Sequence, residues 1–410
     1  MRAMRQRTIF PAVMTLLLLS SMSAVSADFD ELAQMGEDAL TAGKYDEAIK
    51  YYEKITATGK TYINILSVRF DLAWCYYLTG QPDKAIPLFE SLSGNRSPSE
   101  SVKQQSMFLL AECHARLASM QEEKPAARKK NLEKALKLHT EFQKKYPKNP
   151  NIPQSYYGRA YAYYLDRQLE KAAADLQTVI TKYPGTPTVK DATYLLASVY
   201  SEQALDKLKA GDKEASKGYI NKARELFDGL SKGKGVNLAL ANDSYFSLAE
   251  TWFAAGEYLE AIRYYQQMRS KAEVVRNIRK LREQVEQQFM EALRKKEDTT
   301  VTRAAMDKLK VQIRDVSKAP NMMISGYFKI ADAFYRLERY DETRAVSRHL
   351  LNFTEDEQKQ QAYYLLITSY LKEENADAAA REFESFQEIF GVDVPMADTV
   401  SLSIGQLYMQ

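Results

Sequence analysis

One phrase recurs along this chain of 410 residues and constrains its fold more than any other feature. Residues 43–55, 80–92, 167–179 and 256–268 each place an alanine among acidic and apolar or aromatic neighbours. The aligned positions are Ala48, Ala85, Ala135, Ala172, Ala223, Ala261, Thr343 and Ala379. They are spaced by 37, 50, 37, 51, 38, 82 and 36 residues, and the step of 82 fits two repeats, one of them degenerate. A period of about 34–40 residues is typical of a helical solenoid, which predicts partner binding as the default function.

The first 27 residues have the pattern of a secretory signal peptide. Arg2, Arg5 and Arg7 form a basic region, an apolar run from Ile9 to Leu19 follows, and Val25-Ser26-Ala27 supplies a small-x-small cleavage site. We expect the mature chain to begin near Asp28 and to be periplasmic. The alternative, an uncleaved membrane anchor, is disfavoured because the apolar run is too short to span a bilayer. No cysteine lies near the cleavage site, so a lipid anchor is not expected.

Export changes the charge and cysteine arguments. The precursor has 57 basic and 54 acidic residues, but three of the arginines lie in the signal, so the mature chain is neutral overall. Neutrality removes any general electrostatic case for nucleic acid or an anionic membrane surface. Cys75 and Cys113 occupy equivalent places in consecutive repeats, where helix packing sets residues about 8–10 Å apart. We favour two buried free thiols over a disulfide, which export would permit.

Each repeat is predicted to be a pair of helices. The first helix carries a small residue, such as Ala73, Ala160 or Ala249, with a large ring three positions later. The second helix has apolar residues four and seven positions after its aligned alanine, which is one face of a helix with 3.6 residues per turn. Two prolines, Pro147 and Pro184, stand twelve residues after their alanines, where a helix should end.

These features resemble those of the tetratricopeptide-repeat family over nearly the whole mature chain. The segments EFQKKYPKNP (141–150) and QTVITKYPGTP (177–187) are similar to repeats of bacterial envelope members, namely the Tol–Pal-associated periplasmic coordinators and the outer-membrane-protein assembly lipoproteins. The resemblance implies an all-α fold, a right-handed superhelical solenoid of about eight to nine helix pairs, in the cell envelope.

Spacing predicts how the repeats are divided. We expect a solenoid over 28–271, a degenerate helix pair over 272–320 with KEDTT as its turn, and C-terminal repeats over 321–410. Two pairs, near 111–135 and 197–223, carry insertions of 12 and 14 residues that should lengthen both helices, with turns at Pro125 and Gly211. They could be projecting docking elements or only longer solvated helices. The last repeat is incomplete, so its helix either caps the stack or belongs to a longer protein.

The resemblance also places a binding surface, because first helices line the concave face of these solenoids. The residue three before the small residue points there, and residues four and seven further on share its face. The predicted partner-binding residues are Phe70, Trp74, Tyr77, Phe108, Tyr157, Tyr161, Tyr164, Tyr194, Phe246, Phe253, Phe328, Tyr335 and Tyr364. The competing interpretation is that the rings are ordinary core, which is weakest for Trp74, Tyr77, Tyr161 and Tyr164.

The polar residues offer no catalytic or metal-binding pattern. His114 and His139 take aromatic places in their helices and are expected in the core, while His349 stands alone. GLSKGKG (229–235) lacks the spacing of a phosphate-binding loop. We therefore expect no enzyme activity, no cofactor and no metal. Glu112, Glu250 and Asp332 lie among the rings, where they either pair with a basic or amide-rich ligand or are merely solvated.

The leading hypothesis is a periplasmic scaffold that holds a partner protein or an extended peptide on its aromatic concave face and supports envelope assembly. Association with peptidoglycan is the alternative, because aromatic rings stack on sugars. A third reading makes the chain the solenoid part of a longer protein. None of these involves nucleic acid or an integral membrane span after signal cleavage.

Overall fold

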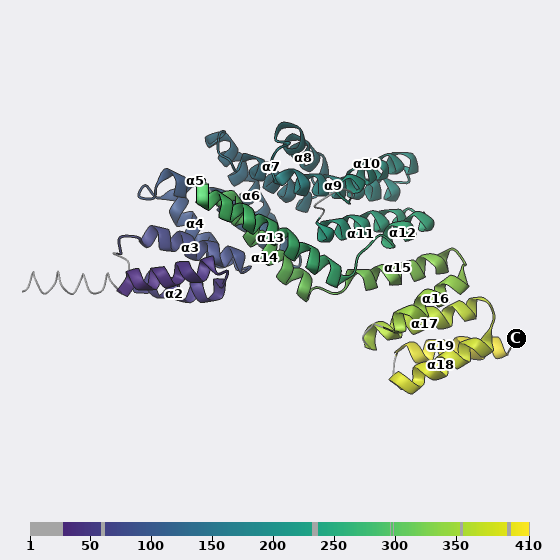
Figure 1. Cartoon of the computed structure of the whole chain (residues 1–410). Coiled ribbons are helices and arrows are strands. Elements are labelled where there is room, and N and C mark those ends of the chain that lie inside the picture. Colours follow the sequence, from purple (N-terminus) through teal and green to yellow (C-terminus); the bar gives the residue numbers. More distant parts are fainter. Residues whose placement is uncertain are drawn as a thin grey trace, which may run out of the picture. The chain divides into compact units, whose positions relative to one another are not determined.

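The computed structural model of the chain describes residues 28–58, 62–231, 237–295, 297, 299–352, 356–391 and 395–409. Within these ranges every regular element is an α-helix, and the helices are arranged in antiparallel pairs (Figure 1). We call the leading helix of a pair the first helix and the other the second helix. The signal peptide predicted for residues 1–27 lies outside the described residues, as does most of the GLSKGKG segment.

The first helices are residues 28–41, α3 (Ile65–Leu78), α5 (Glu100–Ser119), α7 (Ile152–Leu165), α9 (Thr188–Lys209), α11 (Leu238–Ala254), α15 (Met322–Arg336), α17 (Asp356–Lys372) and α19 (Pro395–Tyr408). The second helices are α2 (Tyr45–Thr58), α4 (Pro82–Gly94), α6 (Pro125–Lys145), α8 (Leu169–Lys182), α10 (Lys213–Ser231), α12 (Tyr258–Tyr265), α16 (Tyr340–Leu351) and α18 (Ala376–Phe390). The chain is an all-α repeat solenoid, as the sequence predicted.

Small residues set the distance between paired helices. The aligned residues of the second helices, from Ala48 to Ala379, are fully buried, and so are their counterparts on first helices, such as Ala73 and Ala249. A methyl group at the crossing lets two backbones approach, and the large residues one turn away fill the remaining space. In α8, for example, Leu176 and Val179 follow Ala172 and are also fully buried.

The recurring phrase begins in the turn just after each first helix. Gly43, Gly80 and Gly256 have φ between 74° and 80°, in the left-handed region that glycine adopts without a Cβ clash. The amide after each of the first two bonds back across the turn, Lys44 N to Ala39 O and Gln81 N to Tyr76 O, both at 2.8 Å. Arg167 holds the same place with φ 60°, at a steric cost that glycine avoids.

The two lengthened pairs are present. Helices α5 and α6 have 20 and 21 residues and α9 and α10 have 22 and 19, whereas α3, α7 and α8 have 14 each. Pro125 is the first residue of α6, and Gly211, with φ 80°, lies in the α9–α10 turn. Both insertions therefore extend their two helices as predicted.

Residues 271–318 form a helix pair that departs from the expected stacking. The pair consists of α13 (Lys271–Lys295) and α14 (Thr300–Lys318), and its KEDTT turn lies partly outside the described residues. However, α12 and α11 both pack directly against α15, so the stack continues past the pair, which contacts α11 instead. On α13 only Val274 and Ile278 are buried. A repeat inside the stack needs apolar contacts on two sides, and this pair has them on one.

The chain divides into two compact units, unit 1 up to Thr188 and unit 2 from Val189. In unit 1 the core runs through consecutive pairs and includes Cys75 and Cys113, both buried and free. In unit 2 separate apolar clusters lie along α9 to α15 and along α17 to α19. Among the described helices, none is both long and apolar enough to cross a membrane.

Candidate functional site

The structure places most of the predicted binding residues at intermediate depth. Phe328 is buried, Tyr364 is 43% exposed, and the other eleven are half-buried. Half-burial is the state in which a ring can both pack on the protein and contact a ligand. Whether a given ring can also contact a ligand depends on which neighbouring side chains cover it.

In most first helices, one predicted ring stands three residues before the small residue. Four of these rings lie against the second helix of their own pair. The ring centroids are 5.6–5.8 Å apart, at angles that are tilted or edge-on. These contacts are Phe70–Phe89, Phe108–Phe142, Tyr194–Phe227 and Phe246–Tyr265. In α17 the corresponding contact is made by the neighbouring residue, because Tyr363 packs on Phe386 and Tyr364 is left exposed. One side of each packed ring therefore belongs to the interior of its pair.

A different arrangement holds Trp74, Tyr77 and Tyr161, which we call the unit 1 patch. Trp74 and Tyr77 are stacked on α3, with centroids 5.5 Å apart and planes at 19°. Arg116 of α5 lies 5.5 Å from the centre of the Tyr77 ring and donates a hydrogen bond of 2.8 Å to the Tyr77 carbonyl. Tyr161 of α7 hydrogen-bonds with Ser119 of α5. Three successive first helices thus bring the patch together.

Burial raises the pKa of both tyrosines in the patch, and the Glu112 carboxylate raises it further while Arg116 opposes the effect. Their hydroxyls are therefore neutral donors at physiological pH. Tyr157 and Tyr164 share α7 with Tyr161 and are half-buried. The patch combines large apolar ring faces with polar tips and one guanidinium, the side-chain types that dominate binding energy at protein interfaces.

A polar core lies beneath this patch. The Oε1 atom of Glu112 is 3.4 Å from Nε2 of His139, and the His139 Nδ1 atom is 3.2 Å from the Ser155 hydroxyl. Burial lowers the pKa of His139 to about 3, with Arg159 adding to the effect, so its imidazole is neutral. Gly158 makes room for the pair, since a Cβ there would lie 2.3 Å from Glu112 Oε1 and 2.6 Å from the imidazole.

The acids that the sequence placed among the rings already have partners within the chain. Glu250 accepts a hydrogen bond from the Tyr265 hydroxyl and lies 3.1 Å from Lys329 Nζ. Asp332 lies 3.1 Å from Arg336 Nε. Glu250 and Asp332 are thus each engaged by a side chain of their own or a neighbouring helix.

In unit 2 basic side chains cover part of the aromatic stripe. Lys329 Nζ and the Arg336 guanidinium each lie 5.2 Å from the centre of the Phe253 ring, which also meets Tyr258 edge-on at 5.2 Å. Tyr335 hydrogen-bonds with Thr368 of the next first helix. These cation–π contacts cover part of the Phe253 ring and leave it less available to a ligand than Trp74.

The sequence interpretation missed these basic residues, although a signal existed. Arg116 and Arg336 each stand five residues after the small residue of their first helix, Ala111 and Ala331. That position is one turn beyond Glu112 and Asp332, on the same helical face as the predicted rings. A search for every polar type on this face would have found both.

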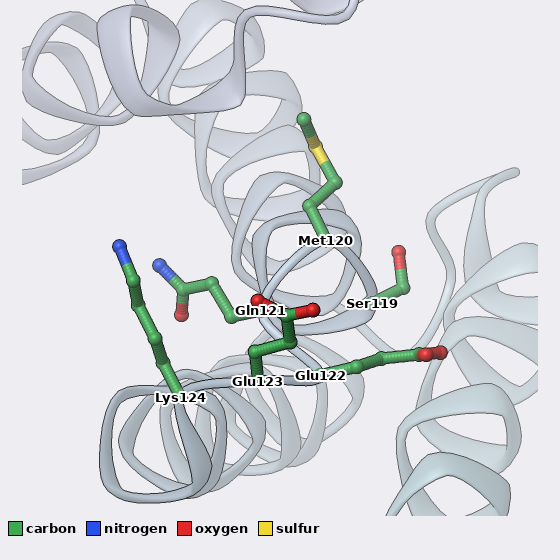
Figure 2. Close-up of a pocket in the computed structure, with 6 residues that line it drawn as sticks. All are labelled: Ser119, Met120, Gln121, Glu122, Glu123 and Lys124. Atoms are coloured by element: carbon green, nitrogen blue, oxygen red, sulfur yellow. The ribbon is translucent and has the colours of Figure 1, made fainter.

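A pocket of about 340 Å³ opens at the turn between the lengthened helices α5 and α6. Ser119, Gln121, Glu122 and Lys124 are among its lining residues, and Figure 2 shows Lys124 and Gln121 on one side of the turn with Glu122 on the other. Ser119 also bonds Tyr161, so the pocket adjoins the unit 1 patch.

The structure also places the histidines and the possible metal ligands of the described part of the chain. No group of three or more His, Cys, Asp or Glu residues there could hold a metal ion. His114 and His139 are buried at 2% and 0% exposure, as expected of core residues, and His349 packs on the ring of Tyr327.

Known protein families resemble separate parts of the chain. The sequence model of the outer membrane lipoprotein family YfiO matches residues 118–232, which contain both segments that resembled envelope proteins. Two tetratricopeptide-repeat models match residues 30–93 and 201–273. No curated protein matches the chain.

Several solved structures are also similar. A tetratricopeptide-repeat protein from Parabacteroides merdae is 14% identical, with 84% of this chain and 99% of that one covered and a TM-score of 0.39. A thermophilic tetratricopeptide-repeat protein from Thermus thermophilus is 19% identical, with 54% and 98% covered and a TM-score of 0.38. The apo form of RapI is 12% identical, with 79% and 76% covered and a TM-score of 0.48.

Likenesses this distant say nothing about a shared ligand. The family models and the packing of the helix pairs agree on the kind of repeat, and the lipoprotein match agrees with an envelope setting. Two stretches of the chain, residues 30–93 and 201–273, match tetratricopeptide-repeat models, and residues 118–232 match an outer membrane lipoprotein model, so the chain resembles tetratricopeptide-repeat proteins, including envelope members.

Proposed function

We propose that this protein is a non-catalytic scaffold of the periplasm, which holds an extended segment or a helix of a partner protein along its first helices and supports envelope assembly. The unit 1 patch is the main anchor. One observation carries the proposal: Trp74 and Tyr77 stack on each other and are only half-buried, beside Arg116. Two stacked rings at a solvent boundary cost hydration free energy that a partner's apolar side chain would recover.

Two further observations support this choice of anchor. The rings of Phe70, Phe108, Tyr194 and Phe246 each pack with one side on the second helix of their own pair, whereas the two stacked rings of the patch lie on the same first helix. Tetratricopeptide repeats are typically protein-binding scaffolds without catalytic activity, and the lipoprotein-like segment 118–232 includes Tyr161. The comparisons give no support to a peptidoglycan association, so we do not carry that alternative forward.

Affinity capture followed by titration tests the proposal. Residues 28–410 are immobilised and exposed to envelope extract, beside a Trp74→Ala/Tyr161→Ala variant. Tyr51→Ala is the matched control, because Tyr51 is also a half-buried tyrosine but lies on the second helix α2. We expect the wild-type chain and the control to retain a discrete protein that the double variant loses. Trp74 fluorescence should then shift on titration with that purified protein.

The outcomes separate the anchor from the scaffold. Loss of binding by roughly a hundredfold in the double variant, with unchanged helicity, is expected when two central aromatic anchors are removed. Equal binding by all three chains would refute the unit 1 patch as the anchor. If the Tyr51→Ala control binds the captured partner more weakly than the wild-type chain does, the site would instead include the second helices.

A further inference from the structure

Asp243 lies on the first-helix face of unit 2 that carries Phe246. On α11 it stands three residues before Phe246 and seven before Glu250, so the three residues share one side of the helix. Asp243 is half-buried. Glu250 is engaged by Tyr265 and Lys329, whereas among the described residues no lysine, arginine or histidine nitrogen lies within ion-pair distance of Asp243.

Tyr194 of the preceding first helix faces this carboxylate. Its hydroxyl hydrogen-bonds with Ser247 of α11, which lies one turn beyond Asp243. Burial raises the pKa of Tyr194, and the nearby Asp243 carboxylate raises it further. Burial alone raises the pKa of Asp243 to about 6. The surroundings thus disfavour a negative charge that nothing in the described chain neutralises.

The preceding repeat has an aspartate at the position equivalent to Asp243, and that aspartate has a basic partner. Asp191 and Asp243 both stand six residues before the small residue of their first helix, Ala197 and Ala249. Asp191 forms an ion pair with Lys308 of the inserted helix α14. Helix α14 also reaches the start of α11, where Asn237 donates a hydrogen bond of 3.0 Å to Gln312. A lysine on a helix beside the first helices therefore already engages one of two matching carboxylates.

We propose that Asp243 and Tyr194 form an acceptor subsite for a lysine or arginine side chain of the segment that binds along the first helices of unit 2. The inference rests on the proposed function and specifies the chemistry of the partner. An ammonium or guanidinium group would form a charge-assisted hydrogen bond with the carboxylate. Its positive charge would offset the free-energy cost of keeping the carboxylate ionised in this partly buried place. Basic residues on the partner are favoured here and not beside Glu250, where Lys329 already lies.

Peptide selection with matched variants tests this subsite. A library of random dodecapeptides is selected near neutral pH on residues 28–410, on Asp243→Asn and on Asp191→Asn. The asparagine variants keep the side-chain shape and remove the charge. Asp191→Asn is the control, because the chain's own Lys308 already pairs with that carboxylate. We expect lysine or arginine to be enriched at one position for the wild-type chain and for Asp191→Asn, and not for Asp243→Asn.

A double-mutant cycle then assigns the contact. The best peptide and its Lys→Gln form are titrated against the wild-type chain and Asp243→Asn. We expect the lysine peptide to lose roughly tenfold in affinity on Asp243→Asn, while the glutamine peptide changes little. Equal losses for both peptides, or the same loss on Asp191→Asn, would overturn the subsite but leave the scaffold function standing. Failure of every peptide to bind along the first helices would overturn both.

Discussion

Gly158 sets how closely α7 approaches the polar core under the unit 1 patch. We predict that Gly158→Ala destabilises the protein by about 1–3 kcal/mol, because the new Cβ would lie 2.3 Å from the Glu112 carboxylate and 2.6 Å from the buried His139 ring. Urea denaturation measures the change. Gly218→Ala is the matched control, since Gly218 is exposed on α10 with nothing within 4 Å of a built Cβ.

The control variant Gly218→Ala should raise the free energy of unfolding, whereas Gly158→Ala should lower it. Alanine restricts the unfolded chain and favours helix, so Gly218→Ala is expected to stabilise by about 0.5–1 kcal/mol. A Gly158→Ala variant as stable as the wild-type chain would show that the Glu112 and His139 side chains can move aside. In that case the close contact is not what determines the residue at position 158.

Asp243 predicts a pH dependence of stability. Its pKa in the fold is about 6, above the 3.8 of an unperturbed aspartate, so between these pH values the folded chain holds a proton that the unfolded chain has lost. The free energy of unfolding should therefore fall as pH rises from about 4 to 6 and stay lowered above that range. Asp243→Asn removes this loss, and we expect it to stabilise the chain by about 1–3 kcal/mol at pH 7.5 and by little near pH 4. Urea titrations at both pH values measure it.

Loss of stability in Asp243→Asn at pH 7.5 would mean that the carboxylate has a partner within the chain. That result would also remove the basis for a subsite that accepts a partner's cation. The pH series is informative because a simple packing defect would destabilise the variant equally at both pH values.

At the scale of elements, the α13–α14 pair is attached to unit 2 along one side. Ile278 is fully buried with Val274 and Ala239, against Leu309 and Ile313. We predict that Ile278→Ala costs about 2–4 kcal/mol and raises the hydrogen-exchange rate of α14 amides. Leu293, on the same helix but 48% exposed, is the control, and Leu293→Ala should change stability by less than about 0.5 kcal/mol. Equal effects would show that the outer half of α13 is also packed.

The elements also show where sequence reasoning worked. The aligned alanines predicted the helix pairs and the two lengthened pairs, because a 3.6-residue period and a small residue at the crossing are local signals. The same reasoning treated residues 272–318 as a degenerate repeat of the stack. An amphipathic helix has the same pattern whether its apolar face packs on the next repeat or on the side of α11, so only the contacts of α12 with α15 decide between them.

At the scale of the whole molecule, neighbouring pairs contact mainly each other, so local opening should stay local. Cys75 and Cys113 are fully buried in unit 1, and burial raises the pKa of the Cys113 thiol. We predict that iodoacetamide labels neither thiol in the native chain and both after unfolding. Gly158→Ala should speed the labelling of Cys113, whereas Ile278→Ala in unit 2 should not. Equal acceleration by both variants would indicate one cooperative unit.

The sequence by itself determined the repeat, the pairing of helices and the identity of the buried alanines, because these follow from short-range periodicity. It also predicted which rings share the first-helix face. It could not predict which of those rings are covered, since coverage depends on side chains from the next helix: Phe89 on Phe70, and Lys329 and Arg336 on Phe253. Only the tertiary structure distinguishes Asp191, paired with a lysine 117 residues away, from Asp243.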